Sequence, residues 1–251
     1  MAPSVDFSKP RDLIGELFDP DDGTKKQFND RFSRQVIEFA ERLSPGFARF
    51  EKLMEGQHGM QTALVCMFCH GVLDDLVISV KLLLTGKLSA SGNLARQATE
   101  GICMAIMCAH ADTLSIGKKE QIYWKLVEAD DPAAEGHLAS RQFVENWIRI
   151  DLNQAGAQQL KETIETHHGH SHAGRLAAAN RMDLGPNGKL HIGGHFDIAK
   201  LETYELEFKQ RMNICGSAIE ALDALQPRIN AILQAAPPFG NISRSPDLRP
   251  W

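Results

Sequence analysis

The chain has 251 residues, with 43% hydrophobic and 24% charged side chains, and this composition is typical of a globular protein rather than of a disordered chain or a fibrous repeat. Its formal net charge is −5, which argues against a protein that holds nucleic acid through an extended basic face. We therefore do not expect nucleic acid among its partners.

Residues 1–23 are acidic and contain no apolar run of signal-peptide length, so we expect a short N-terminal arm on a cytoplasmic protein. The five cysteines, an odd number, fit the same reducing compartment. Residues 24–27 have the spacing of a capping box, which predicts a helix from there to about residue 43. Ser44 followed by Pro45 predicts the end of that helix and the start of a short one that reaches Gly56.

Two long helices are predicted next, over residues 59–84 and 89–113. The connector between them is short, so the two helices are expected to be antiparallel neighbours. The first is the most apolar part of the chain, but polar side chains interrupt it, namely His70, Asp74, Asp75 and Lys81. Charges at mid-bilayer depth are costly, so the sequence predicts a buried helix rather than a membrane span.

Helical periodicity continues to the end of the folded part, with helices predicted at about 118–130, 133–151, 155–180 and 198–225. Pro227 is expected to end or kink the last helix. Residues 182–197 break the pattern with glycine-rich turn sequences. The sequence therefore predicts an all-α fold. One antiparallel helical bundle spans 24–236, with a short irregular or two-stranded excursion near 182–197 and an extended tail at 237–251.

The predicted helical hairpin brings polar residues of its two helices together. In an antiparallel pair that turns near residue 87, the numbers of facing residues add up to about 175. Glu100 is then expected to face Asp75, and Arg96 to face Ser79. The resulting polar cluster contains His70, Asp74, Asp75, Arg96 and Glu100. Two interpretations are open, a buried ion-pair network or an interhelical pocket that binds a small-molecule ligand.

Residues 167–172 hold four of the ten histidines of the chain. On a helix His168 and His172 share a face, and Glu165 lies one turn before His168. Neutral imidazole is a common metal ligand, so Glu165, His168 and His172 are candidate ligands of a divalent metal. His170 and His172 are also candidates for contact with a bound ligand. The alternative is an exposed histidine-rich helix, since histidine tracts are weak signals.

Three further patterns could carry metal or ligand chemistry. Glu165-x-x-His168 and Glu55-x-x-His58 have the spacing of di-metal helical bundles. Cysteines and histidines of the two central helices face one another and could form a thiolate site: Cys66, Cys69, His70, Cys103, Cys108 and His110. The irregular segment carries His191, His195 and Asp197, which are candidates for the wall of a site. The default for the cysteines is a set of buried thiols.

The segment Leu94–Glu100, with the sequence LARQATE, and the later His170-Ser171-His172-Ala173 resemble bacterial all-helical families related to HEPN-like domains. This resemblance implies an all-α bundle, often dimeric, and a component of a toxin–antitoxin or defence system. Active HEPN ribonucleases carry an arginine and a histidine separated by four to six residues, and no arginine here has a histidine at that distance downstream. The resemblance therefore implies ligand or partner binding rather than RNA cleavage.

From these patterns we expect a cytoplasmic, homodimeric helical-bundle protein that binds a small-molecule ligand or a protein partner at the interhelical polar cluster. The alternatives are a metal-dependent enzyme that uses residues 167–172 with glutamates, and an interaction module. The sequence assigns no catalytic residue.

Overall fold

The computed structural model describes residues 8–151, 154–171, 175–184 and 190–235. The predicted C-terminal tail lies outside these ranges. Within them the fold is all-α, as predicted. The helices are α1 (Pro10–Leu17), α2 (Asp22–Glu55), α3 (Gly59–Leu84), α4 (Leu88–Cys108), α5 (Tyr123–Glu128), α6 (Gly136–Glu145), α7 (Gln154–Ser171), α8 (Arg175–Ala179) and α9 (Leu201–Ala235), with 3-10 turns at Pro132–Ala134 and Ile198–Lys200.

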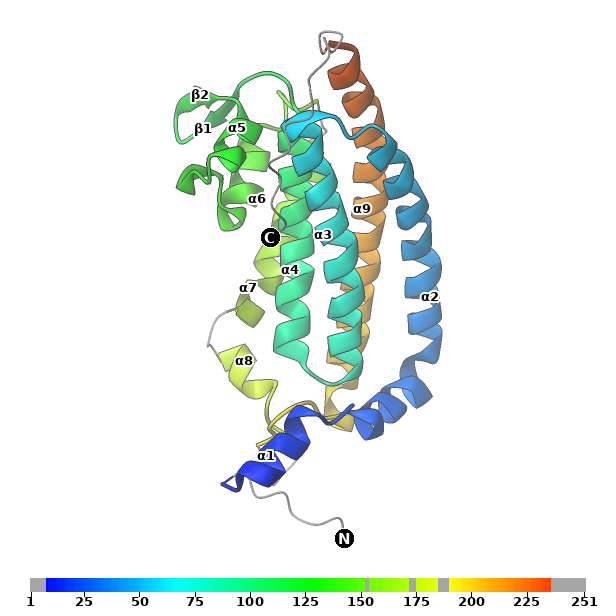
Figure 1. Cartoon of the computed structure of the whole chain (residues 1–251). Helices are drawn as coiled ribbons and strands as arrows, with labels where there is room; N and C mark the ends of the chain where they lie inside the picture. Colours follow the sequence, from blue (N-terminus) through cyan, green and yellow to red (C-terminus); the bar gives the residue numbers. More distant parts are fainter. Residues whose placement is uncertain (1–7, 152–153, 172–174, 185–189, 236–251) are drawn as a thin grey trace.

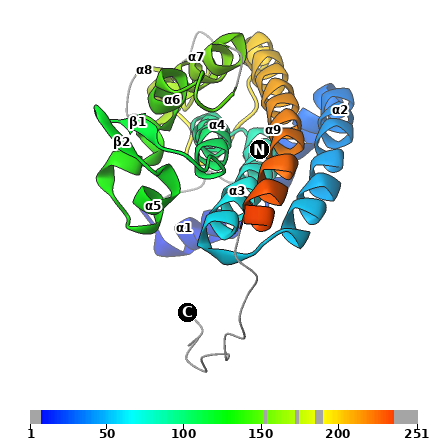
Figure 2. The same cartoon turned by 90° about the horizontal axis from the view of Figure 1, so that it is seen from above.

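Helix α4 occupies the centre of the bundle, as the view from above in Figure 2 shows. It packs against α3, α6, α7 and α9, and 14 of its 21 residues are buried. Its many small residues let other helices approach closely from several sides. At Gly101, for example, a β-carbon would lie only 2.8 Å from Cγ2 of Val72 on α3. Helix α2 and the long α9 complete the bundle and lie against each other (Figure 1).

Helix α3 is long and apolar enough to cross a membrane, with a mean hydropathy of 1.8 in its most apolar window. Length and composition do not separate such a helix from the core helix of a soluble protein. In the bundle α3 contacts α2, α4 and α9, and 11 of its residues are buried. Its position in the core accounts for its apolar sequence, as predicted.

The two predicted proline breaks are wrong. Helix α2 continues through Pro45, and α9 continues through Pro227. Proline inside a helix costs about 3 kcal/mol or more, but packing can outweigh this cost. Phe39 and Leu43 before Pro45 are buried, as is Leu53 after it, so one apolar face holds both halves of α2 against the bundle. The departure from helical dihedral angles in α2 lies at Phe32 instead.

The predicted helix at 118–130 is wrong in its first part, because a β-hairpin precedes α5. Strands β1 (Leu114–Ile116) and β2 (Lys119–Gln121) are antiparallel, with Ile116 opposite Lys119. The two-residue turn, Gly117 and Lys118, has positive φ at both positions, as tight hairpin turns require. Asn146 at the end of α6 holds the hairpin, because its side chain accepts from the Ser115 N–H at 2.7 Å and donates to the Ser115 carbonyl at 3.0 Å.

Other boundaries also differ from the predictions. The predicted helix at 133–151 is shorter and ends at Glu145, and the described residues of the one at 155–180 are largely helical, in α7 and α8. The acidic arm contains α1. The excursion near 182–197 is irregular, and among its described residues the strand-like feature is an isolated bridge between Met182 and Leu190. The two-stranded sheet therefore lies in the hairpin before α5, outside the predicted segment.

A buried arginine ties three helices together. Arg211 of α9 is 0% exposed, and its guanidinium donates to Glu207 Oε2 at 2.6 Å, to Ser79 Oγ of α3 at 2.8 Å and to Ser91 Oγ of α4 at 2.6 Å. The two serines also donate to each other's carbonyl oxygens, at 2.8 and 2.6 Å. This buried network fixes how α3 and α4 lie along each other.

We predict that Arg211→Leu lowers the free energy of unfolding by about 3–5 kcal/mol, because it leaves the Glu207 carboxylate buried without its ionic partner. The matched control is Arg49→Ala, which breaks the exposed Arg49–Asp223 pair and should cost no more than about 1 kcal/mol. Urea denaturation measures both. Adding Glu207→Leu to Arg211→Leu should recover part of the loss, and equal losses for the two arginine variants would contradict the role of the network.

Candidate functional site

Asp75 of α3 and Glu100 of α4 line one groove, as the sequence predicts. The groove has a volume of about 160 Å³ and lies between the two helices, with Gly136 at the start of α6 on its border. Its remaining walls are largely apolar and include Phe68, Val72 and Met104. Two carboxyl groups therefore line the same mostly apolar recess.

Glu100 is only 8% exposed. Its Oε1 lies 3.4 Å from Nε of Arg96, one turn earlier on α4, and its Oε2 lies 3.5 Å from where a β-carbon of Gly136 would be. Burial raises the pKa of Glu100, and the positive charges of Arg96 and His137 offset part of this rise. The start of α6 contributes partial positive charge near the same carboxylate.

Asp75 is partly buried and forms no ion pair within the described part of the chain. Burial and the neighbouring Asp74 raise its pKa from 3.8 to about 6. At neutral pH the folded protein thus holds a carboxylate that its surroundings disfavour. A carboxyl group with a raised pKa in a groove is a candidate binding group.

The other members of the predicted cluster do not join the groove. His70 and Asp74 are exposed, and the His70 ring packs against Phe50 with ring centres 5.7 Å apart. The predicted pairing of Ser79 with Arg96 is wrong, because Ser79 instead bonds to Ser91, about one turn earlier on α4. Of the predicted ligand-binding residues on α3 and α4, Asp75 and Glu100 line the groove and Arg96 lies beside Glu100.

The histidine-rich segment stays a prediction. The side chains of His168 and His170 and the whole of His172 lie outside the described residues. Glu165 is exposed and pairs with Lys161 at 3.7 Å. The other Glu-x-x-His match is divided by a helix end, because α2 stops at Glu55 and α3 begins after His58. Those two residues do not share a helical face.

All five cysteines are buried and free. The thiols of Cys66 and Cys108 are near enough to Cys69 to raise its pKa further, after burial has made the largest contribution. The sequence therefore brings these thiols together as expected. Burial also raises the pKa of Cys108, to about 12. Protonated thiols are poor metal ligands, so the arrangement fits the default of buried thiols.

A second polar site lies at the opposite end of the bundle from the hairpin, in the segment between α8 and α9. Asp183, His191 and His195 have ligand atoms within 4.8 Å of one another, and within the described ranges this is the one such group of three. The Met182–Leu190 bridge and the hydrogen bond from the His191 N–H to the Arg181 carbonyl bring the two stretches together.

Sequence analysis singles out the two histidines together with Asp197, whereas the structure groups Asp183 with the histidines. Asp197 accepts hydrogen bonds from the N–H groups of Ala199 and Leu184, at 2.9 and 2.8 Å, and so caps the start of the turn before α9. Burial acts to raise the pKa of Asp197, but these two hydrogen bonds and the positive charges of Lys200 and His195 together outweigh it, and the pKa is lowered. No sequence pattern pairs Asp183 with the histidines, because the bridge between Met182 and Leu190 brings them together.

The segment that carries His195 touches the α3–α4 turn through backbone alone. A β-carbon at Gly194 would overlap the Thr85 carbonyl, and one at Gly86 would overlap the His195 backbone. Gly86 also has a φ of +73°, which favours glycine. Two glycines therefore hold the segment against the end of the bundle.

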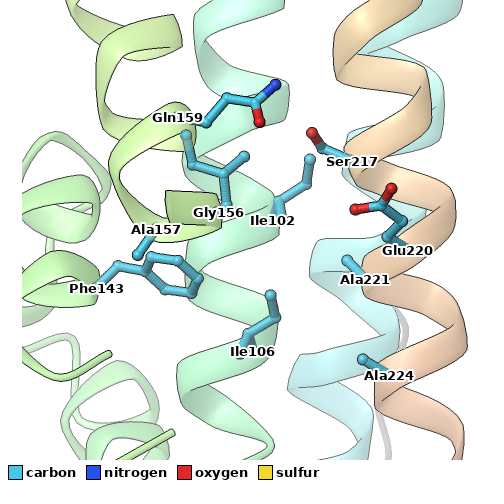
Figure 3. Close-up of a pocket in the computed structure, with 11 residues that line it drawn as sticks. Ile102, Ile106, Phe143, Gly156, Ala157, Gln159, Ser217, Glu220, Ala221 and Ala224 are labelled. Carbon is cyan, nitrogen blue, oxygen red and sulfur yellow. The ribbon is translucent and has the colours of Figure 1, made fainter. Parts of the chain in front are cut away.

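A third recess, of about 120 Å³, lies over α4 between α7 and α9 (Figure 3). Ile102, Ile106 and Phe143 supply apolar walls, and the polar side chains of Gln159 and Ser217 lie at one end. No cluster of charged residues accompanies these polar groups in the lining, so this recess offers less chemistry than the groove at Asp75 and Glu100.

Comparison of the chain with family models, curated proteins and solved structures finds no match. The resemblance to HEPN-like domains therefore stays a prediction.

We predict opposite effects for two glycine substitutions. Gly194→Ala must displace the Thr85 backbone and should lower the free energy of unfolding by more than about 1 kcal/mol. Gly216→Ala lies inside α9, where a β-carbon meets nothing within 4 Å, and should raise it by about 0.5–1 kcal/mol. Chemical denaturation measures both. Equal tolerance at the two positions would mean that the segment is not held against the α3–α4 turn.

Proposed function

We propose that the protein binds a small organic cation, such as a primary ammonium with an apolar body, in the groove between α3 and α4. The observation that carries this proposal is that Asp75 and Glu100 line the same mostly apolar recess. Arg96 balances one of the two carboxylates. The other, Asp75, is available to a cation.

The walls of the groove support an apolar body on the ligand. Val72 and Met104 supply apolar surface, and Phe68 adds an aromatic ring, whose face can attract an ammonium group. The alternative is a purely structural ion-pair network. Such a network satisfies its charges internally, as Arg211 does, whereas the pKa of Asp75 is raised rather than lowered.

The pH dependence of stability tests whether the ionised form of Asp75 lowers the free energy of unfolding. Its pKa is about 6 in the folded protein and near 3.8 in the unfolded chain, so the folded state binds the proton more tightly. Stability should therefore fall as pH rises from about 4 to about 6, and the penalty should be complete above that range.

Asp75→Asn should remove this penalty, and we predict a variant more stable than the parent by about 1 kcal/mol at pH 7.5, a figure that allows for solvent screening. At pH 4 the two should differ little. Asp74→Asn, at an exposed position, should change stability less. Parallel unfolding free energies for parent and Asp75→Asn across this pH range would contradict the raised pKa.

Ligand binding is tested with n-butylammonium and phenethylammonium, using calorimetry on the full chain and the corresponding neutral alcohols as comparison. We expect the amines to bind more tightly than the alcohols, and Asp75→Asn and Glu100→Gln each to weaken amine binding at least about tenfold, as loss of a charged contact does. Asp74→Asn is the matched control. Equal binding of amines and alcohols, or no binding of either, would sink the proposal.

We also propose that the protein is a cytoplasmic homodimer. Five free, buried thiols support a reducing compartment. Exposed apolar side chains at the lower end of the bundle, including Phe18 at 83% exposure, support self-association. Sedimentation should give twice the chain mass of 27.8 kDa, and Phe18→Asp should shift it toward the monomer. A monomer at all accessible concentrations would contradict the dimer.

A further inference from the structure

We propose that Asp183, His191 and His195 form a binding site for a divalent first-row transition-metal ion. This site is separate from the groove between α3 and α4, and neither proposal depends on the other. It also differs from the histidine-rich segment at residues 167–172.

The distances suit one shared ion. Asp183 Oδ1 lies 2.9 Å from Nε2 of His191 and 3.7 Å from Nε2 of His195. Two donors each about 2.1 Å from a tetrahedral metal are about 3.4 Å apart. The two imidazole rings are stacked, with centres 4.1 Å apart and planes 12° from parallel. Because the lone pairs lie in the ring planes, binding of one ion requires both rings to turn out of this stack until their Nε2 atoms point at the same position.

His191 supplies a second observation that points to a ligand. Its Nε2 atom is buried and has no hydrogen-bond partner, because the contact with Asp183 lacks hydrogen-bond geometry. Buried polar atoms are usually satisfied, and one that is not needs an explanation such as an ion. A metal bound between His191 and Asp183 would satisfy this nitrogen.

Lys200 is the one positive charge against the site in the described structure, and its contacts direct it elsewhere. Its Nζ lies 3.2 Å from Nε2 of His195. However, the same ammonium reaches the carbonyl oxygens of Ala179, Asn180 and Met182 at 3.2, 3.3 and 2.5 Å. The three carbonyls can take all three of its N–H donors, so a metal at His195 would replace the contact between Nζ and Nε2 while the ammonium keeps its carbonyl partners. The Asp197 carboxylate offsets the lysine charge.

The donor set indicates the class of metal. Two imidazoles and one carboxylate suit zinc, iron, cobalt or nickel rather than magnesium or calcium, which prefer oxygen ligands. Three protein ligands leave at least one position for water. Asp183 and His191 are each about one-third exposed, so the site lies near the protein surface, and three protein ligands make it unlike a closed four-ligand structural site.

The test is titration of the metal-free full chain with Co²⁺, followed by absorption, and with Zn²⁺, followed by calorimetry. We expect one equivalent of metal to bind, without the intense charge-transfer band of a cobalt–thiolate bond. Asp183→Asn and His191→Gln should each weaken binding by more than about 100-fold, since loss of even an outer-shell partner costs about 10–100-fold. Circular dichroism checks that both variants stay folded.

Two controls separate this site from others. His137→Gln, at an exposed histidine elsewhere, should leave the affinity unchanged. The triple variant His168→Gln, His170→Gln, His172→Gln should keep the one equivalent. If the triple variant loses the metal while Asp183→Asn and His191→Gln keep it, or if the parent binds no stoichiometric Co²⁺ or Zn²⁺, the proposal is wrong. Metal binding with failure of amine binding would leave this site standing and remove only the groove function.

Discussion

The fully buried guanidinium of Arg211 sets the geometry of the bundle. A charge in the core must be paired and hydrogen-bonded, and here the partners come from α3, α4 and α9. Ser79 and Ser91 meet the guanidinium and each other, so α3 cannot slide along α4 without exposing buried polar atoms to apolar surroundings. Asp75 lies one turn from Ser79 on α3. The packing of α3 on α4 that satisfies Arg211 also forms the groove that Asp75 and Glu100 line.

The helix pair α3–α4 contacts a neutralised pair of charges near its turn and carries incompletely neutralised carboxyl groups further along. Near the α3–α4 turn, Arg211 and Glu207 neutralise each other within hydrogen-bond distance. Further along, burial raises the pKa of Asp75 and no positive charge of the described residues is seen to offset it. At Glu100 the charges of Arg96 and His137 offset part of the same rise. Natural proteins often keep such locally unfavourable groups where they bind ligands. The contrast between these two parts of the helix pair is the physical basis for assigning the groove, rather than the core network, to binding.

The helices follow from apolar periodicity, and the hairpin of α3 and α4 follows from its short connector. The sequence also predicts that Asp75 and Glu100 share a site, but it misses the contact of Ser79 with Ser91. A short connector fixes how two antiparallel helices align only to within about one helical turn. The rule that proline ends a helix fails at Pro45 and Pro227, because buried residues before and after each proline hold the helix against the bundle despite the lost hydrogen bond. Glu207 and Arg211, four residues apart, have the spacing of an exposed pair, and only the packing of α9 shows that they are buried. Asp183 is found only through a bridge between two irregular stretches.

The backbone contact of Gly86 with His195, and of Gly194 with Thr85, has an evolutionary consequence. Charged pairs such as Arg96 and Glu100 recur by chance in many helical proteins, but two distant positions that both exclude any side chain are a rarer constraint. A β-carbon at either glycine would collide with main-chain atoms of the other segment. Changing a neighbouring side chain therefore cannot make room for it. A sequence that keeps this backbone contact can vary its surface and even its groove, but it needs a glycine in each of the two segments.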